Sequence, residues 1–276
     1  MWPAIKYWVN NRFKQLYPHI STLSAYGCSL TAGGELGDHI LTPDAEDIKR
    51  SRGYVYWANN VIDNADPELK QLWHDAELAG AWPKLTADLL NMQVVNNAQG
   101  GSSLGLSVWL FEQDILLGRV DPKTTLFVFG VTNIGRIKLF EPSPMSTLHM
   151  GNPIGKPRYW CERTIIDIVS DGFLLWNHLQ LLERIHALAQ RLDLKIAVFN
   201  MFEPMTPSQY ETIAQADLAV FQHQWDRLNT LPGFFLLEPS MSNFIGHGET
   251  LGCGHPNAAV HARFAKHVVG CLNQLS

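Results

Sequence analysis

The sequence predicts an α/β fold in which helices cover both faces of a parallel sheet. Five short apolar or β-rich runs are each followed by turn residues, and segments with helical periodicity lie between them. Strands that alternate with helices favour parallel pairing, because each crossover helix returns the chain to the same edge of the sheet. With 276 residues, 46% of them hydrophobic, the chain can bury one sizeable core. We therefore expect a single domain over residues 1–276.

The expected elements follow from the pattern of apolar residues. The expected strands are 22–26, 92–95, 125–131, 195–200 and 234–237. The third is apolar almost without interruption, as in strands buried on both faces. The expected helices are roughly 54–64, 82–90, 103–116, 165–192 and 258–272. The last has one apolar stripe at three- and four-residue spacing. Two segments, 33–81 and 141–160, look like loop excursions that could wall a ligand site at the sheet edge.

Composition and charge argue against several classes of function. The formal net charge is −5, the pI is about 6.1 and no dense Lys/Arg cluster is present, which argues against a protein that binds nucleic acid through phosphate contacts. No apolar stretch approaches the roughly 20 residues of a membrane span, and the N-terminus lacks the apolar core of a signal peptide. We therefore expect a cytoplasmic protein with no membrane span. Its four scattered cysteines show no zinc spacing, so we expect free thiols.

The first residue that could carry chemistry is Ser29, at the end of the first expected strand. It follows Gly27 and Cys28 and precedes small residues, which would expose its hydroxyl at the carboxyl edge of the sheet. A serine hydroxyl is a weak nucleophile and needs a base that accepts its proton. Because a serine in this position is also typical of a helix N-cap, Ser29 alone does not indicate an enzyme.

Three other pieces lie at expected strand ends or just past the last strand. Gly101 belongs to a Gly-Gly-Ser-Ser run whose backbone N–H groups can face developing negative charge. Asn133 comes just after the third strand and can offer its side-chain amide to the same oxyanion. His255 precedes Pro256, which we expect to open the last helix. With Ser29, these residues form a candidate nucleophile, base and oxyanion-binding set.

The order of these pieces resembles the SGNH hydrolases of the GDSL esterase/lipase superfamily. The residues that match the four blocks of that family are Gly27, Ser29 and Leu30 in the first, Asn96 and Gly101 in the second, Gly130 and Asn133 in the third, and His255 and Pro256 in the fourth. Cys28 and Gly252 stand where the family has aspartate. No single block is specific, so the resemblance depends on their order and on the strands that they follow.

The resemblance implies a three-layer α/β/α sandwich with a flavodoxin-like five-stranded parallel sheet. It also implies a serine esterase without a cofactor or metal, in which Ser29 forms an acyl-enzyme and His255 is the general base. The oxyanion hole would consist of the backbone N–H groups of Ser29 and Gly101 and the side chain of Asn133. The expected substrate is a small-molecule or carbohydrate ester, such as a short acyl group on a polar alcohol.

The acid that would orient His255 is absent from its family position, Gly252. Glu249, Glu238 or a backbone carbonyl could take this role. Two alternatives to the esterase remain: an acyltransferase that uses the same Ser29 and His255 but excludes water in favour of an acceptor alcohol, or a catalytically inactive binding module on this fold, which the missing acid and Cys28 favour.

Other arrangements of the same residue types are also open. Residues 101–105 fit the G-x-S-x-G pattern of α/β-hydrolases with Ser103 as nucleophile, although five residues separate the strand from this motif. Cys28 could be the nucleophile, or it could form a disulfide with Cys253. His247 and His255 could form a metal pair.

Overall fold

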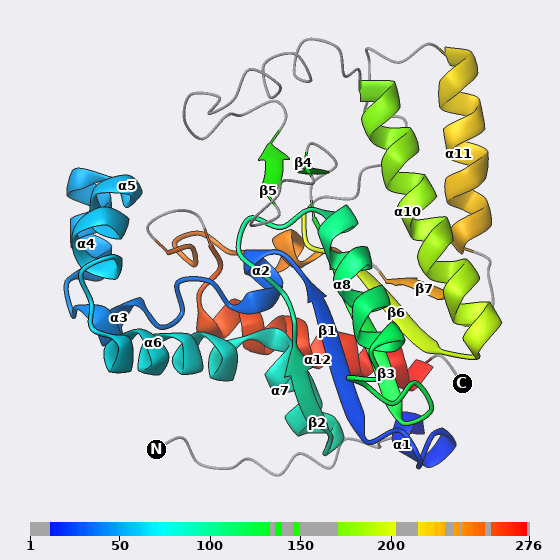
Figure 1. Ribbon diagram of the computed structural model, residues 1–276, viewed down its shortest axis with the longest axis horizontal. Coiled ribbons are helices and arrows are strands. Elements are labelled where there is room, and N and C mark those ends of the chain that lie inside the picture. Colours follow the sequence, from blue (N-terminus) through cyan, green and yellow to red (C-terminus); the bar gives the residue numbers. More distant parts are fainter. Residues whose placement is uncertain are drawn as a thin grey trace.

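A five-stranded parallel sheet lies at the centre of the molecule (Figure 1). The computed structural model describes residues 12–132, 136–139, 146–149, 171–202, 215–229, 234–237, 239–251 and 255–274. The strands are β1 (Thr22–Gly27), β2 (Gln93–Asn96), β3 (Thr125–Val131), β6 (Lys195–Asn200) and β7 (Phe234–Leu237). Their order is β2-β1-β3-β6-β7, and every neighbouring pair is parallel. This is the doubly wound, flavodoxin-like order, and it confirms the expected fold class.

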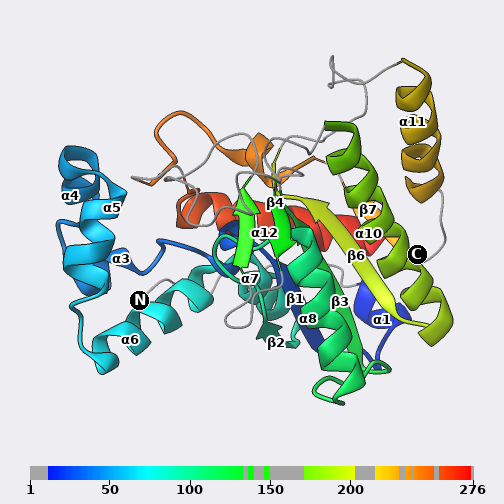
Figure 2. The same ribbon diagram turned by 45° about the horizontal axis from the view of Figure 1, so that its top comes forward.

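Helices connect the strands and cover both faces of the sheet (Figure 2). They are α1 (Arg12–Leu16), α2 (Ser29–Ala32), α3 (Asp38–Leu41), α4 (Ala45–Arg52), α5 (Tyr54–Trp57), the π-helix η1 (Ala58–Ile62), α6 (Pro67–Gly80), α7 (Trp82–Leu90), α8 (Leu104–Leu116), α10 (Asp171–Leu192), α11 (Gln215–Asn229), the 3-10 helix η3 (Met241–Phe244) and α12 (Ala258–Gln274). The segment 33–81, which we expected to be a loop excursion, therefore contains α3, α4, α5, η1 and α6.

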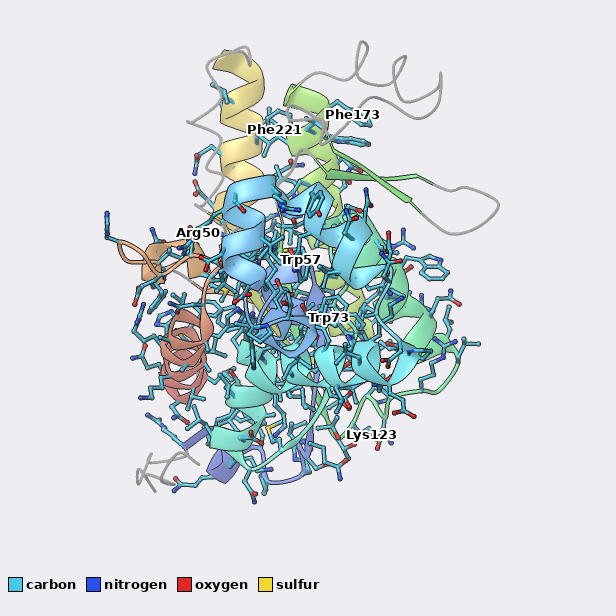
Figure 3. The ribbon with its side chains drawn as sticks, turned by 90° about the vertical axis from the view of Figure 1, so that its left-hand side faces the viewer. Arg50, Trp57, Trp73, Lys123, Phe173 and Phe221 are labelled. Carbon is cyan, nitrogen blue, oxygen red and sulfur yellow. The ribbon has the colours of Figure 1, made fainter. Side chains whose placement is uncertain are left out.

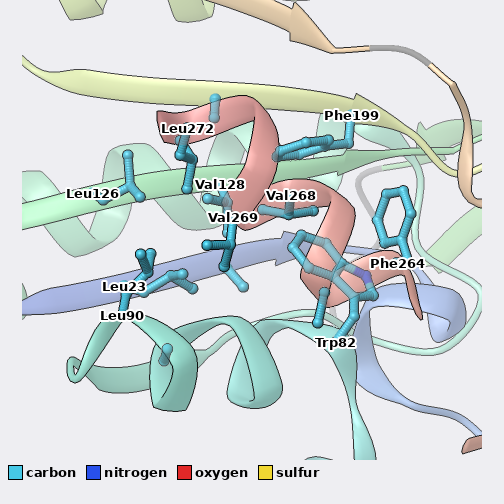
Figure 4. Close-up of a cluster of buried hydrophobic side chains, with 14 of the residues drawn as sticks. Leu23, Trp82, Leu90, Leu126, Val128, Phe199, Phe264, Val268, Val269 and Leu272 are labelled. Carbon is cyan, nitrogen blue, oxygen red and sulfur yellow. The ribbon is translucent and has the colours of Figure 1, made fainter. Parts of the chain in front are cut away.

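One face of the sheet packs against α1, α7 and α12. Alternate residues of the central strands, such as Leu23, Val128 and Phe199, point to this face and are fully buried. The rings of Trp82 from α7 and Phe264 from α12 meet the ring of Phe199, and each other, edge to face (Figure 4). Burying side chains of this size stabilises a fold by roughly 1.5–3 kcal/mol each, so this layer holds β1, β3 and β6 in register.

The opposite face packs against α8 and α10. Tyr26, Phe127 and Phe129 point to this side and are completely buried. Phe111 of α8 contacts all three rings, with centroids 5.1–5.7 Å apart. The two layers leave the carboxyl ends of the strands as the edge from which loops emerge, so this edge is where a ligand site is expected.

A small antiparallel hairpin, which we did not expect, lies outside the main sheet. It pairs β4 (Arg136–Leu139) with β5 (Ser146–His149). Most of the expected excursion 141–160 lies outside the described residues, and the single-domain organisation stays a prediction. None of the described helices combines the length and apolar character that crossing a membrane requires.

Candidate active site

Ser29 lies at the carboxyl end of β1, where the chain turns sharply from strand to helix. Cys28 continues the extended backbone of β1, with φ −92° and ψ −165°, and Ser29 is the first residue of α2. The helix ends after one turn, because Gly33 adopts φ +84° and donates its N–H to the Ser29 carbonyl. The Ser29 side chain is half-buried at this turn, while Cys28 is fully buried below it.

The turn fits closely onto the sheet because two strands end in glycine. The side chain of Thr31 in α2 lies directly over β1 and β3. A Cβ atom at Gly27 would lie 2.3 Å from Thr31 Oγ1, and one at Gly130 would lie only 1.9 Å from it. Gly27 and Gly130 belong to different blocks of the family pattern, but both must lack a side chain for the same reason: Thr31 occupies the space above them, beneath Ser29.

His255 joins the Ser29 hydroxyl to a carboxylate. Its Nε2 atom lies 2.6 Å from Ser29 Oγ, and its Nδ1 atom lies 2.6 Å from Glu35 Oε1. The lowered pKa of Glu35, argued below, makes its carboxylate an acceptor only, so Nδ1 carries the proton of the neutral imidazole. The unprotonated Nε2 can then accept a hydrogen bond from the Ser29 hydroxyl. This is the tautomer that a general base requires.

The segment before α12 holds His255 in this position. The Leu251 N–H donates to the His255 carbonyl at 2.6 Å, and Pro256 forms a bridge with Thr250. The helix begins at Ala258, and the Asn257 side chain caps it by accepting the N–H groups of the next residues. The expectation that Pro256 opens the helix is therefore wrong: Asn257 is the cap.

Glu35 was not among the acids that the sequence suggested. It lies six residues after Ser29, in the loop that follows α2, and its backbone has φ +71°. This left-handed conformation is unfavourable for a residue with a side chain and is maintained only by strong surrounding contacts. Here the Glu35 N–H donates to Oε1 of the α6 residue Glu77 at 2.6 Å. The available signal was the pair Gly33-Gly34, which lets the chain fold back over Ser29.

The Glu35 loop lies directly on the backbone of α6. A Cβ atom at Gly33 would lie 2.4 Å from the Glu77 carbonyl oxygen, and one at Gly37 would lie 2.4 Å from the Trp73 carbonyl oxygen. Only glycine permits this approach. Between them, Gly34 lies beside the reacting groups, since a Cβ there would be 3.1 Å from Ser29 Cβ. The loop that carries Glu35 therefore packs directly against the backbone of α6, which fixes its position.

The charges around Glu35 determine its protonation state. Burial opposes ionisation of Glu35, but hydrogen bonds from His255 and Lys49 outweigh it and lower its pKa. Burial likewise disfavours the Lys49 ammonium, but hydrogen bonds to Asp38, Glu35 and Glu46 raise its pKa above the usual value. Glu77 differs, because its burial raises its pKa to about 7. Glu35 is therefore an anion at neutral pH, while Glu77 is near its titration midpoint.

Among the described residues, one group of carboxylates has the spacing of metal ligands. Oxygen atoms of Glu35, Asp38 and Glu46 lie within 4.8 Å of one another. The Lys49 ammonium lies 2.6–2.7 Å from all three side chains. A cation is thus already provided by the chain itself. His247, the other suggested ligand, is exposed in the loop before His255.

The loop 97–102 brings Gly101 towards the nucleophile side of the sheet edge. The carbonyl of Gly27 accepts two hydrogen bonds from this loop, one from the Gln99 N–H at 3.0 Å and one from Ser102 Oγ at 2.6 Å. Gly101 has φ +73°. Within the described part of the chain, no carbonyl accepts a hydrogen bond from the N–H of Ser29 or Gly101. Asn133, the third expected donor, lies outside the described residues.

Two alternatives disagree with the structure. Ser103 is fully buried and caps α8, where its Oγ accepts the Leu106 N–H at 3.2 Å. It is a helix cap, so the prediction of a nucleophile elbow at Ser103 is wrong. Cys28 is a free, completely buried thiol, so the proposed disulfide is wrong, and His255 contacts the hydroxyl of Ser29.

The candidate acid Glu249 does not take part in the contact with His255 Nδ1. Glu249 accepts hydrogen bonds from Arg263 of α12 and from the Gly246 N–H, and Glu238 lies outside the described residues, as does Cys253. The Nδ1 atom of His255 meets the Glu35 carboxylate, so among the described residues a carboxylate stands where a backbone carbonyl was the alternative.

Solved structures share this arrangement of strands and helices. A carbohydrate esterase family 2 enzyme from Corynascus thermopiles (Myceliophthora fergusii), which also carries a carbohydrate-binding domain, is 13% identical, with a TM-score of 0.50 over 92% of this chain and 66% of that chain. A lipolytic protein of the G-D-S-L family from Desulfitobacterium hafniense is 10% identical, with a TM-score of 0.46 over 91% of this chain and 98% of that chain. A member of the same family from Veillonella parvula is 11% identical, with a TM-score of 0.45 over 91% and 97%.

The sequence itself matches no protein-family model and no curated protein. At such low identities, the likeness to solved structures is one of fold. Three observations identify which fold this is: the likeness to the carbohydrate esterase, the β2-β1-β3-β6-β7 strand order and the position of Ser29 at the carboxyl edge of the sheet. The protein therefore has the fold of the SGNH hydrolases.

Proposed function

We propose that the protein is a serine esterase that hydrolyses a carboxylic ester through an acyl-enzyme on Ser29. One observation carries this proposal: His255 lies 2.6 Å from Ser29 Oγ on one side and 2.6 Å from Glu35 Oε1 on the other. A nucleophile in contact with a base, and a base oriented by an anion, form the arrangement that activates a serine hydroxyl.

The proposed reaction proceeds in two steps. In the first, Ser29 Oγ attacks the ester carbonyl while His255 Nε2 takes its proton, and the tetrahedral intermediate collapses to an acyl-serine. The leaving alkoxide takes the proton back from His255 and departs as the alcohol. In the second step, His255 removes a proton from water, which attacks the acyl-serine. The tetrahedral intermediate then releases the carboxylic acid as His255 returns the proton to Ser29 Oγ.

Glu35 has the role that the sequence analysis left unassigned. Its carboxylate holds His255 in the productive tautomer and stabilises the imidazolium that forms when Ser29 is deprotonated. The lowered pKa of Glu35 keeps this charge present at neutral pH. The catalytically inactive module was suggested by the missing acid and by Cys28, and Glu35 removes the first of these two arguments.

The proposed oxyanion hole consists of the backbone N–H groups of Ser29 and Gly101 and the side chain of Asn133. The first two donors have no carbonyl partner within the described part of the chain, which supports their role. The assignment of Asn133 depends on the family resemblance alone. Loss of one such donor typically removes about 3 kcal/mol of transition-state stabilisation.

We further propose that the acyl group is short and that the alcohol is a carbohydrate or another small polar molecule. The carbohydrate esterase that shares the fold makes acetylated sugars the first substrates to test. The comparison is between acetyl, butyryl and octanoyl esters of 4-nitrophenol, followed by acetylated xylan and acetylated glucose. A preference for octanoyl over acetyl would contradict this substrate class.

The experiment that tests the proposed function combines labelling with turnover. The protein is incubated with a fluorophosphonate probe and with 4-nitrophenyl acetate, alongside S29A and the matched control S103A. We expect wild type and S103A to be labelled and active, and S29A to lose both, with a roughly 10⁴-fold or larger fall in kcat. If the wild-type protein is neither labelled by the probe nor able to hydrolyse the ester, the catalytically inactive binding module becomes the favoured alternative. Transfer of the acyl group to added alcohols in preference to water would indicate an acyltransferase.

A further inference from the structure

Lys49 is a buried charge that the mechanism above does not use. It lies in α4, and its side chain has no exposure to solvent. Its ammonium is 2.7 Å from Glu35 Oε2, 2.7 Å from Asp38 Oδ2 and 2.6 Å from Glu46 Oε1. Removing an ammonium from water costs several kcal/mol unless anions surround it in good geometry. Here three anions do so, and one of them touches the candidate base.

Lys49 and His255 divide the two oxygens of the Glu35 carboxylate between them. Oε1 lies 2.6 Å from His255 Nδ1, and Oε2 lies 2.7 Å from Lys49 Nζ. A carboxylate held at both oxygens cannot rotate away from either partner, so Lys49 sets the plane in which Glu35 meets the imidazole. The Glu35 side chain is only 5% exposed, so no other cation from solvent replaces this contact.

The position of Lys49 is itself determined by neighbouring elements. The second oxygen of Asp38 accepts the indole N–H of the α6 residue Trp73 at 3.0 Å. The ring of Trp57 in α5, completely buried, lies 5.2 Å from the ammonium. Figure 3 faces this side of the molecule and labels Trp57 and Trp73 between the α4–α5 pair and α6. The helices of the segment 33–81 therefore converge on the cation behind Glu35.

We propose that Lys49 is a positioning residue of the active site: its buried ammonium keeps the Glu35 carboxylate charged and aimed at His255. This inference rests on the proposed esterase function and extends it to a residue that does not touch the substrate. It gives the helices α3 to α6 a role in catalysis, because they assemble the contacts that place the ammonium.

The charged groups around Glu35 determine how the activity should depend on pH when Lys49 is replaced. The groups that face Glu35 are Lys49 and Glu46 from α4, Asp38 from α3, Glu77 from α6 and His255. Burial opposes ionisation of Glu35, and the Lys49 ammonium is one of the groups that offset it. Without this ammonium, and with carboxylate oxygens of Asp38 and Glu46 within 4.8 Å, the pKa of Glu35 rises, and the carboxylate that stabilises the imidazolium is lost at a higher pH than in wild type.

The test compares K49M, which keeps the length of the side chain but removes its charge, with K49R, which retains the charge. Lys84, which pairs with Asp88 on the surface of α7, supplies the control K84M. For K49M we expect kcat/KM for 4-nitrophenyl acetate at pH 7 to fall roughly 100-fold. We also expect the acidic limb of the pH profile, the range in which activity falls as the pH decreases, to move upward by at least about one pH unit. K49R should recover most of the activity and the wild-type limb, and K84M should match wild type.

The double variant E35Q/K49M separates positioning from a general effect on the fold. If Lys49 acts through Glu35, K49M lowers kcat/KM little further when Glu35 is already replaced. A K49M protein that folds and keeps the wild-type pH limb would overturn the proposal, as would full additivity in the double variant.

Should K49M fail to fold, D38N gives the opposite test. It removes one anion and leaves Lys49 and Glu35 together, so the acidic limb should move to lower pH, and an unmoved or raised limb would count against the proposal. Inactive wild type would contradict the proposed function itself, whereas active wild type with unaltered K49M contradicts only the role of Lys49.

Discussion

The nucleophile and the acid of the candidate site are held by different kinds of interaction. Ser29 is positioned by close packing, since Thr31 fills the space above Gly27 and Gly130 and Cys28 is buried in the apolar core. Glu35 is positioned by its charge, by hydrogen bonds that its carboxylate accepts from Lys49 and His255, and by the hydrogen bond that its N–H donates to Glu77. The described contacts that hold the Ser29 turn involve Thr31, Cys28 and two glycines, none of them charged, whereas the contacts of Glu35 involve its own carboxylate and the Lys49 ammonium.

Because of this difference, the Ser29 turn and the Glu35 loop should respond to different perturbations. Packing depends on shape and is insensitive to pH, so defects on the nucleophile side should lower stability equally at all pH values. Charge networks depend on protonation, so defects on the acid side should change with pH. The same difference explains why a local sequence motif predicts the nucleophile but not the acid.

The largest stability effect is expected from G130A, on the nucleophile side. The added methyl group would lie 1.9 Å from Thr31 Oγ1 and 3.1 Å from Met201, and overpacking of this kind costs about 3 kcal/mol or prevents folding. The loss should be equal at pH 5 and pH 8 in urea denaturation. In the double variant G130A/T31A the nearest atom is removed, so part of the lost stability should return. A G130A protein as stable as wild type would contradict the proposed packing.

E77Q should have an intermediate effect, and only at higher pH. The raised pKa of Glu77, about 7 and caused mainly by burial, means that the folded protein holds this proton more tightly than the unfolded chain. Its contribution is therefore fully present below about pH 4.5 and is lost as the pH rises through about 7. We expect E77Q to exceed wild type in stability at pH 8 by on the order of 2 kcal/mol, with little difference at pH 5.

The exposed Glu68 on the same helix provides the matched control for Glu77. E68Q should follow wild type at both pH values. Equal unfolding midpoints for E77Q and wild type at pH 8 would show that the acid side is not sensitive to charge in the way described.

The smallest of these effects is expected from S103A, outside both regions. Loss of the N-cap hydrogen bond to Leu106 should reduce stability by about 1 kcal/mol, with fluorophosphonate labelling unchanged. Thermal unfolding and labelling of the same sample check both parts. A loss of labelling in S103A without unfolding would restore the nucleophile-elbow hypothesis.

Much of the fold follows from local patterns in the sequence. The apolar runs at Thr125–Val131, Lys195–Asn200 and Phe234–Leu237 coincide with β3, β6 and β7. For β3 and β6, almost every residue is buried between the two helical layers, which favours apolar side chains. Ser29 was identifiable from its place at the carboxyl end of an expected strand, where a sheet presents its site, and its pairing with His255 was expected from the resemblance to the SGNH hydrolases. The structure places these two side chains in contact.

Glu35 and its surroundings were not predictable in the same way. Its position depends on a left-handed backbone that no residue preference favours, and on a lysine 14 positions further along the chain. The short helices α3 and α4 span four and eight residues, too few turns for a clear apolar periodicity, and α4 carries a lysine whose side chain is buried. Contacts between charges from separate elements leave no spacing pattern in the sequence.

The central claim, that Glu35 is the acid that orients His255, is tested most directly by kcat/KM for 4-nitrophenyl acetate in E35Q and E249Q at pH 8. Both variants replace a glutamate near the base in sequence or space, but only Glu35 contacts His255, while Glu249 pairs with Arg263. The account predicts a fall of roughly 10²–10⁴-fold in E35Q and less than about threefold in E249Q. Equal activities in the two variants, with both proteins folded, would contradict it.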